Sequence, residues 1–381
     1  MRYYIIAGEA SGDLHGSNLI KALREKDNQA EIWAWGGDMM EQAGARIRKH
    51  YRDLAFMGFL EVVKNLKTIL RNMEFCKQDI MAFQPDVVIF VDYPGFNLRI
   101  AKWAKLHDFK TFYYISPQIW AWHSSRVHGI KATVDRMFCI IPFEKDFYKK
   151  YDYDVDYVGH PLLDVVDAHV AKPNFRAFYG LDERPIIAVL AGSRRQEIDK
   201  MLRLMLSVVP HFKAYQFVIA GAPSLPIEFY DNILKLGKNI EYSDIPNPFG
   251  TEGVKIVRNQ TYDLLSNAAF ALVKSGTSTL ETALFDVPQV VCYKGSSFSY
   301  SIAKRVIQVK YISLVNLIAD EPIVKELIQK DLTEQNLVQA LTETIENQIV
   351  IKKKYKILRG LLGNNGAAEK TAVLMIDYLA E

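Results

Sequence analysis

The sequence predicts an α/β protein of two domains, each built on a mostly parallel sheet. Short apolar runs bounded by Gly, Pro or Asp alternate with longer helical patterns, which is typical of βαβ units. This rhythm restarts near residue 170, and 381 residues are too many for one ordinary core. Both halves also open in the same way, with an apolar run that leads into a glycine-containing loop and then a helix, at Ala7–Asp13 and at Ala191–Glu197.

The predicted strands divide the chain into domains 1–170 and 171–366, with parallel sheets that face an interdomain cleft. Ligands of open α/β sheets bind beyond the carboxyl ends of the strands, so we expect the chemistry in the loops that follow them. The strands of the first half are Arg2–Ala7, Glu31–Trp35, Asp86–Asp92, Lys110–Ile115, Arg136–Ile141 and Asp156–Val158. Those of the second half are Ile186–Leu190, Gln216–Ala220, Val254–Val257, Ala268–Val273 and Gln289–Tyr293.

Charge and cysteine content narrow the class of protein. Lys and Arg number 47 against 44 Asp and Glu, so the net charge of +3 does not call for nucleic acid as a partner. Cys76, Cys139 and Cys292 lie far apart and lack metal-ligand spacing, which favours a reducing compartment. No signal peptide and no apolar run of the roughly 20 residues that span a membrane are evident. We therefore expect a protein of the cytoplasm or of a membrane surface.

The stretch Ser275–Glu281 is the strongest indication of a nucleotide site. It follows the apolar run Ala268–Val273, so small hydroxyl residues stand between a buried strand and a helix. The unpaired N–H groups at the start of such a helix favour a diphosphate, and Glu281 is placed to accept hydrogen bonds from a ribose diol. The alternative is that Ser275–Thr279 only cap the helix and that Glu281 is a solvated charge.

Two loops of the first half bring carboxylates to strand ends. Gly8–Gly16 matches neither a dinucleotide fingerprint nor a P-loop, but it contains Glu9, Ser11 and Asp13, which either cap the loop or orient a substrate. Asp92 ends an apolar strand just before a Pro-Gly turn. Its carboxylate is a candidate general base whose pKa partial burial would raise, or it is a turn-forming residue.

Three further groups are candidates for substrate contacts. Trp122 and Arg126 follow another strand and suit stacking on a sugar and pairing with a phosphate, although tryptophans also fill cores. His160 lies near the domain boundary, in a cleft or a plain turn. Arg194 and Arg195 add positive charge to a helix start, which suits a leaving diphosphate without a metal ion.

The segment Leu54–Phe83 interleaves apolar residues with Lys64, Lys67 and Arg71. An apolar face rimmed by bases suits a helix that contacts anionic lipid or acyl chains, whereas a helix packed on its own sheet is the usual alternative. The expected membrane contacts are Phe59, Val62, Val63, Leu66, Ile69 and Leu70.

Taken together, these segments resemble the lipid-A-disaccharide synthase family, in order and over nearly the whole chain. The residues that carry the resemblance are Gly8–Asp13, Met57–Glu61, Pro85–Asp86 with Asp92, Ser116–Trp122, Pro142–Glu144, Val158–His160, Gly192–Arg194 with Glu197, Ser275–Thr277 with Glu281, and Tyr311–Leu317. Where the family often has Gly or Ala after Ser-Arg, this chain has Arg195 and Gln196.

The resemblance implies a GT-B fold without metal or cofactor, whose last helix, Ala367–Leu379, packs back on the N-terminal domain. The implied enzyme transfers 2,3-diacylglucosamine from UDP to the 6-hydroxyl of 2,3-diacylglucosamine 1-phosphate (lipid X), with inversion, at the cytoplasmic face of the inner membrane. The resemblance is compatible with a homodimer. The implied catalytic residues are Asp92, Arg194 and Glu9, with Asp13 and His160 as other candidates for the base. The implied UDP contacts are Gly192, Ser193, Arg194, Glu197, Ser275, Gly276, Thr277, Glu281 and Asn316, and the implied acceptor contacts are Ser11, Asp13, Trp122, Arg126 and His160.

Three other functions remain to be weighed. A UDP-N-acetylglucosamine epimerase would share the architecture but would not need the apolar and basic segment Leu54–Arg71. An inactive UDP-sugar sensor would not need Asp92 and Arg194. An oxidoreductase is disfavoured because no G-x-G-x-x-G follows either opening strand.

Overall fold

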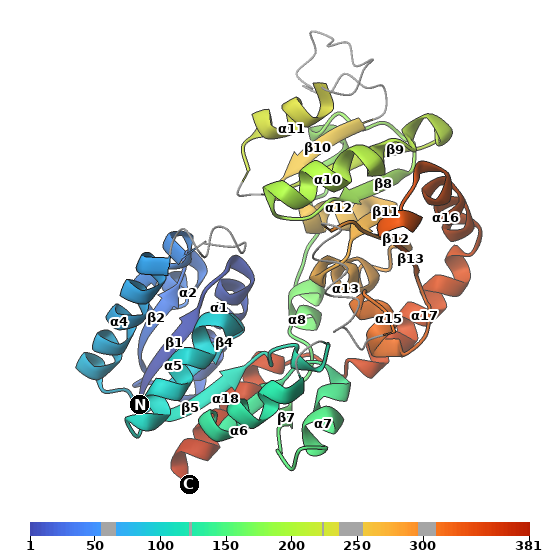
Figure 1. Cartoon of the computed structure of the whole chain (residues 1–381). Helices are drawn as coiled ribbons and strands as arrows, with labels where there is room; N and C mark the ends of the chain where they lie inside the picture. The colour runs from blue at the N-terminus through green and yellow to red at the C-terminus, as the bar shows by residue number, and fades with distance from the viewer. Residues whose placement is uncertain (55–65, 122–123, 223–224, 236–253, 296–309) are drawn as a thin grey trace. The chain divides into compact units, whose positions relative to one another are not determined.

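The structure is a computed structural model, and it describes residues 1–54, 66–121, 124–222, 225–235, 254–295 and 310–381. The chain divides into two compact units (Figure 1). The first unit comprises Met1–Asp164 and Leu362–Glu381, and the second comprises Val165–Leu361.

The first unit is built on a seven-stranded parallel sheet of order β3-β2-β1-β4-β5-β6-β7. Its central strands are continuous apolar runs because helices cover both faces of a parallel sheet, and Tyr3–Ala7 and Val87–Val91 are completely buried. The strands are β1 (Arg2–Ala7), β2 (Glu31–Gly36), β3 (Arg46–His50), β4 (Val87–Val91), β5 (Lys110–Tyr114), β6 (Arg136–Cys139) and β7 (Asp156–Tyr157).

The helices of the first unit are α1 (Ala10–Lys26), α2 (Asp38–Gln42), α4 (Leu66–Phe83), α5 (Pro94–Leu106), α6 (Val127–Thr133), α7 (Pro142–Lys149) and α18 (Ala367–Ala380). The last helix, α18, belongs to this unit and contacts α1. The Asp164 carboxylate fixes the start of α18 by accepting hydrogen bonds from the backbone N–H groups of Gly366 (2.6 Å) and Ala367 (3.2 Å). Helix α8 (Leu162–Asp167) crosses the border between the units.

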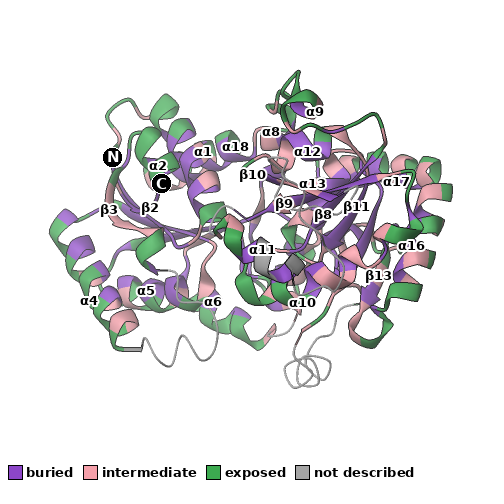
Figure 2. Ribbon diagram, turned by 90° about the horizontal axis from the view of Figure 1, so that it is seen from above, coloured by how far each residue is buried: buried purple, intermediate pink, exposed green. Residues whose placement is uncertain are grey.

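The second unit repeats this plan with six parallel strands in the order β10-β9-β8-β11-β12-β13. Buried residues dominate its central strands (Figure 2). The strands are β8 (Ile186–Leu190), β9 (Gln216–Gly221), β10 (Val254–Arg258), β11 (Ala268–Lys274), β12 (Gln289–Tyr293) and β13 (Lys325–Ile328). The helices are α9 (Phe175–Phe178), α10 (Arg195–Leu206), α11 (Ile227–Lys235), α12 (Thr261–Asn267), α13 (Thr277–Leu284), α15 (Leu314–Ala319), α16 (Glu334–Glu346) and α17 (Gln348–Leu361).

The strand order reverses once in each sheet, between β1 and β4 and between β8 and β11. The paired strands end side by side, since Ala7 pairs with Val91 and Leu190 pairs with Val273. In open α/β sheets ligands bind at such a reversal, beyond the carboxyl ends of the strands. The predicted fold class is confirmed, and four loops are singled out: those after β1, β4, β8 and β11.

Candidate active site

In the first unit, the loops after β1 and β4 meet at the reversal of strand order. Glu9 is half-buried and immediately precedes α1, while Ser11 in the first turn of that helix is exposed. The ring of Tyr93 lies against Gly8, where an added Cβ would come within 2.3 Å of Tyr93 Cδ1. A side chain at position 8 would therefore push the two loops apart.

Asp92 stands directly after β4 in a conformation that its surroundings hold firmly. Its φ is 47°, in the left-handed region, and the φ of Tyr93 is 51°. Its carbonyl oxygen accepts hydrogen bonds from the Tyr113 hydroxyl (2.6 Å) and from Asn97 Nδ2 (2.7 Å), and its N–H donates to the Tyr114 carbonyl (3.1 Å). Left-handed backbone in a non-glycine residue costs on the order of 1–3 kcal/mol and persists only where neighbours enforce it.

Burial sets the electrostatics of the Asp92 side chain. It raises the pKa of the Asp92 carboxyl above its usual value, and the Tyr93 N–H only partly opposes this effect. A raised pKa makes an aspartate a stronger base once it is ionised. The site thus offers a carboxylate suited to accept a proton at the carboxyl edge of the sheet.

Asp13 and His160, the other candidate bases, are placed differently. The Asp13 carboxylate accepts hydrogen bonds from the N–H groups of Gly37 (2.7 Å), Met39 (3.2 Å) and Met40 (3.1 Å), so it fixes the start of α2. His160 is 3% exposed, and burial lowers its pKa to about 3, with a further contribution from His15. A group with such a pKa is a weak base at neutral pH.

Of the other two predicted acceptor contacts, Arg126 is exposed at the end of a short 3-10 helix, Ser124–Arg126, and Trp122 lies outside the described residues. The neighbouring Trp120 Nε1 donates to the buried carboxyl of Glu144 (3.1 Å), which also accepts the N–H of Ile141 (3.0 Å). Burial raises the pKa of Glu144 to about 7. Glu144 therefore holds the segment that carries Trp120.

In the second unit, the loop after β8 closes around a carboxylate. Gly192 has φ 114°, and an added Cβ would come within 2.8 Å of Glu197 Oε2, so this position requires glycine. Glu197 pairs with Lys274 Nζ at 3.0 Å and with an Arg194 guanidinium nitrogen at 3.7 Å. Lys274, at the end of β11, thereby joins the two loops at the reversal of strand order, a role that its sequence position did not reveal.

The start of α10 is positively charged and accessible. Ser193 and Arg194 are exposed in front of the helix, and Arg195 begins it and stacks over the Phe229 ring at 4.7 Å. The N–H groups and dipole of this 12-residue helix add to the two guanidinium charges. This arrangement suits a diphosphate.

The loop after β11 leads into α13 through Ser275 and Gly276. The Ser275 hydroxyl donates to the Ile312 carbonyl (2.8 Å), while Gly276 and Thr277 are exposed at the start of the helix. One turn further on, Glu281 accepts the Tyr262 hydroxyl (2.8 Å), and burial raises its pKa. Ser275 is thus tied to the chain before α15, and the accessible groups are those of residues 276 and 277.

Asn316 has a structural environment that sequence reasoning missed. Its Nδ2 donates to the Val324 carbonyl and to Glu326 Oε1 (both 2.9 Å), and its Oδ1 accepts the Val324 N–H (2.9 Å). Glu326 also accepts the N–H groups of Ile312 and Ser313 (both 3.0 Å). The buried amide therefore shapes the segment that Ser275 binds, and direct contact between Asn316 and UDP stays a prediction.

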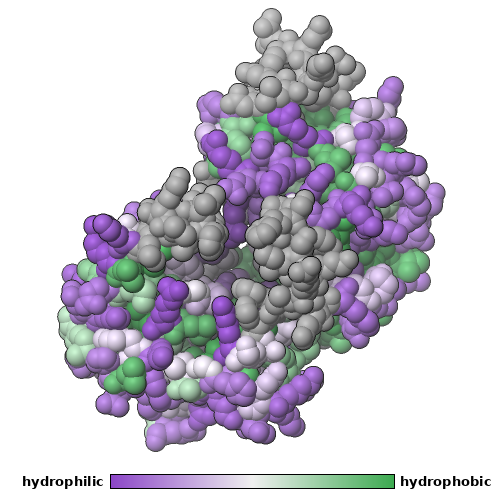
Figure 3. Space-filling view, in the orientation of Figure 1, coloured by the Kyte–Doolittle hydropathy of each residue, from purple (hydrophilic) through white to green (hydrophobic). Residues whose placement is uncertain are grey.

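Of the predicted membrane contacts, Phe59, Val62 and Val63 lie outside the described residues, and Leu66 begins α4. Ile69 is half-buried and Leu70 is 55% exposed. Within the described part of the chain, no helix has the length and apolar character that crossing a membrane requires. Hydrophobic residues form small groups among hydrophilic ones on the face in view (Figure 3).

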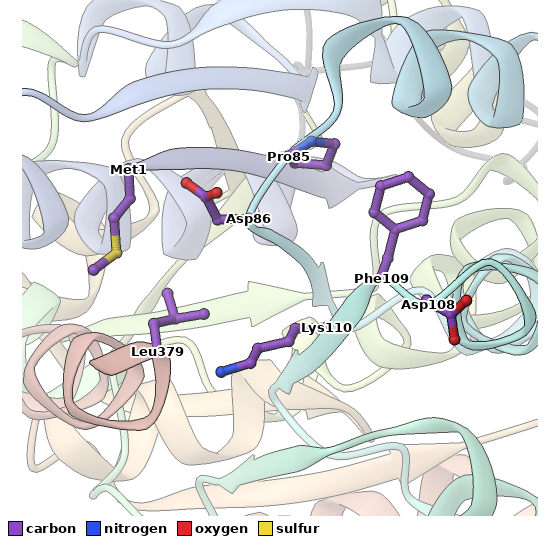
Figure 4. A pocket seen from close by; sticks show the side chains of 7 residues that line it. All are labelled: Met1, Pro85, Asp86, Asp108, Phe109, Lys110 and Leu379. Carbon is purple, nitrogen blue, oxygen red and sulfur yellow. The ribbon is translucent and has the colours of Figure 1, made fainter. Parts of the chain in front are cut away.

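A pocket of about 400 Å³ lies at the amino ends of β1, β4 and β5 in the first sheet (Figure 4). Met1, Asp86 and Lys110 line it together with Leu379 of α18. The pocket is remote from Asp92, which follows the opposite end of β4. Among the described residues, no three His, Cys, Asp or Glu side chains gather as a metal site would require.

Two parallel sheets, each with glycine or hydroxyl loops at the reversal of strand order, define the GT-B fold class. A solved structure of this class, UDP-GlcNAc 2-epimerase from Neisseria meningitidis bound to UDP-GlcNAc, matches with a TM-score of 0.64, 13% identity and full coverage of both chains. At this identity the likeness concerns the fold alone.

The family model described as lipid-A-disaccharide synthetase matches residues 3–373. The lipid-A-disaccharide synthase of Syntrophus aciditrophicus is 38% identical over 384 residues, covering 98% of this chain and 97% of the relative. That of Trichlorobacter lovleyi is 34% identical over 391 residues, covering 100% and 98%. The chain belongs to the lipid-A-disaccharide synthetase family, which confirms the resemblance seen in the sequence and makes the protein a glycosyltransferase.

Proposed function

We propose that this glycosyltransferase joins UDP-2,3-diacylglucosamine to lipid X, giving the β-1,6-linked lipid A disaccharide 1-phosphate and UDP, with inversion. Family membership over nearly the whole chain supports the formation of the disaccharide. The observation that carries the mechanism is the half-buried Asp92, whose carboxyl pKa is raised and whose backbone is fixed by Tyr113 and Asn97.

The reaction needs one proton acceptor and one stabilised leaving group. Asp92 accepts the proton of the acceptor 6-hydroxyl while that oxygen forms a bond to the anomeric carbon of the donor. The bond from the anomeric carbon to the UDP oxygen breaks, and its electron pair leaves with the diphosphate. Attack from the face opposite UDP inverts the configuration. Glu9, beside the same strand reversal, would orient the acceptor.

The second unit would bind the donor. Residues 192–194 and the start of α10 supply N–H groups and charge for the diphosphate, and the accessible residues 276 and 277 supply more N–H groups. Glu281 would bind the ribose, and Glu197 would hold Arg194 in place. Ser275 and Asn316 would shape this site.

The first unit would bind the acceptor at a membrane surface. The acyl chains of both substrates call for lipid contact, and the apolar and basic segment Leu54–Arg71 supports that contact by its composition. We place the protein at the cytoplasmic face of the inner membrane, as a peripheral protein, and a homodimer is part of the same hypothesis.

The test is UDP release from detergent-dispersed UDP-2,3-diacylglucosamine, with and without lipid X. Arg194→Ala should lower turnover about 10²–10³-fold, because it removes charge stabilisation from the leaving group. Arg195→Ala is the matched control, since that neighbouring guanidinium stacks on Phe229, and it should lower turnover far less. UDP binding without acceptor-dependent release would instead favour an epimerase or a sensor. Equal losses in both variants would remove the role of Arg194.

A further inference from the structure

Helix α17 carries an apolar stripe (Val350, Ile357 and Leu361) that faces outward from the second unit. These side chains are 53%, 63% and 46% exposed, and Ile349 in the preceding position is 68% exposed. Their spacing of seven and four residues places Val350, Ile357 and Leu361 within about 40° of one another around a helix that turns about 100° per residue. They therefore form a continuous stripe.

A different face of α17, centred about 110° around the helix from Val350, already anchors the helix. Ile351, Tyr355 and Leu358 are buried, and α17 contacts α13, α15 and α16 of the same unit. Exposed positions alternate with these buried ones along α17 (Figure 2). Packing of the helix within its unit thus leaves the stripe uncovered, and branched aliphatic residues at such positions need another explanation.

The charges around the stripe have one sign. Residues 348–361 include Lys352, Lys353, Lys354, Lys356 and Arg359 and no Asp or Glu. Three of these cations pair with carboxylates of the second unit: Lys352 with Asp286 (3.5 Å), Lys354 with Glu321 (3.0 Å) and Arg359 with Asp167.

Lys353 and Lys356 are exposed, about 60° and 120° around the helix from Val350 on the side away from the buried residues. No carboxylate among the described residues lies within ion-pair distance of either lysine. Around the helix, the stripe lies between Lys353 on one side and Lys354 on the other. The outer face of α17 therefore combines exposed aliphatic side chains with uncompensated positive charge.

We propose that the outer face of α17 binds an anionic lipid surface. An apolar stripe flanked by lysines is the composition of a helix that lies at the boundary between headgroups and acyl chains. A second copy of this chain fits less well, because a two-fold contact through this face would bring the lysines of both copies together. The inference rests on the proposed function in one respect, since lipid substrates bring the protein to a membrane, but it concerns residues far in sequence from Leu54–Arg71.

The experiment measures binding of the full chain to vesicles of phosphatidylglycerol and phosphatidylcholine, against vesicles of phosphatidylcholine alone. Removing the free lysines in Lys353→Gln/Lys356→Gln should weaken binding about fivefold for each lysine, and only on anionic vesicles. Val350→Glu/Ile357→Glu should weaken binding at least tenfold. Val170→Glu, at an 85% exposed position of the same unit, is the control and should bind as the unchanged chain does.

Unchanged vesicle affinity in both double variants would overturn the inference. So would a drop in the mass measured by sedimentation equilibrium without loss of vesicle binding, since that result assigns the face to a second copy. UDP release from detergent-dispersed substrates should stay within about twofold, because these residues lie outside the loops that bind substrate. A chain that binds vesicles through α17 but never releases UDP would refute the proposed function and leave this inference standing.

Discussion

Replacing Asp92 by Asn separates a catalytic carboxylate from a structural one. Asn occupies nearly the same volume and, like Asp, tolerates the left-handed backbone at this position, where φ is 47°. The backbone hydrogen bonds to Tyr113, Asn97 and Tyr114 do not involve the side chain and remain. The substitution therefore removes one negative charge and one proton-accepting site and changes little else.

Turnover and stability should change in opposite directions in Asp92→Asn. Loss of a general base lowers kcat about 10²–10⁴-fold. Stability should rise, because burial raises the pKa of Asp92 in the folded state, so the folded protein loses stability as pH rises through that value. Each unit by which the folded pKa exceeds the unfolded one corresponds to about 1.4 kcal/mol at pH 8. Asp92→Asn should thus raise the unfolding midpoint at pH 8 and leave it unchanged near pH 3.

The assay combines UDP release in detergent with urea unfolding at both pH values. Asp86→Asn is the matched control, at the other end of the same strand, where its carboxylate accepts the Arg2 N–H (2.7 Å). It should keep full turnover and gain no stability. The reasoning about Asp92 is refuted if Asp92→Asn turns over near the normal rate. A fall in stability at pH 8 that matches the loss of turnover would equally refute it, because the carboxylate would then be structural.

Three other predictions concern groups around this carboxylate. Tyr113→Phe removes one of two hydrogen bonds to the Asp92 carbonyl and should lower kcat several-fold with KM unchanged. It should also lower the free energy of unfolding by about 1 kcal/mol. A change in KM alone would contradict this prediction. Asp13→Ala removes three hydrogen bonds at the start of α2 and should lower the free energy of unfolding in urea by about 2–4 kcal/mol. Turnover per folded molecule should be retained, and a selective loss of turnover would make Asp13 catalytic. Burial raises the pKa of Glu144 to about 7, so the stability that its protonated carboxyl contributes is complete below its ordinary pKa and is lost as pH rises through about 7. The melting temperature should therefore fall between pH 5 and 8, and Glu144→Gln should flatten that dependence. A wild-type curve without this fall would contradict the prediction.

The strands that the sequence predicted are those whose burial makes them apolar, and all eleven occur within about two residues of their expected ends. The two strands it missed lie at sheet edges. β3 reads Arg-Ile-Arg-Lys-His and β13 reads Lys-Glu-Leu-Ile. An edge strand pairs on one side only and tolerates charge, so its sequence lacks the signal on which the prediction depends. Expected strand ends such as Asp92 and Ile115 fall outside because their backbone turns left-handed there.

The same limit applies to the candidate site. Local sequence located Asp92 after an apolar run and Ser275 before a helix, because strand ends and helix starts leave local signals. It did not predict that Lys274 pairs with Glu197, 77 positions away, or that Glu326 organises the segment around Asn316, because such partners are chosen by the pairing of strands in space.

Left-handed backbone also occurs where the first sheet would bind its substrate, and it distinguishes Asp92 from Asp13. The φ angles of Asp92, Tyr93 and Ile115 are 47°, 51° and 69°, and for a β-branched residue such as Ile115 this is a true outlier. These residues follow the neighbouring strands β4 and β5. Conformations that cost on the order of 1–3 kcal/mol each persist where the geometry they enforce is useful. Asp13 has no such strain, and its three hydrogen bonds already give it a structural task. A carboxylate held at a cost in stability, rather than one that contributes to it, is what a general base requires.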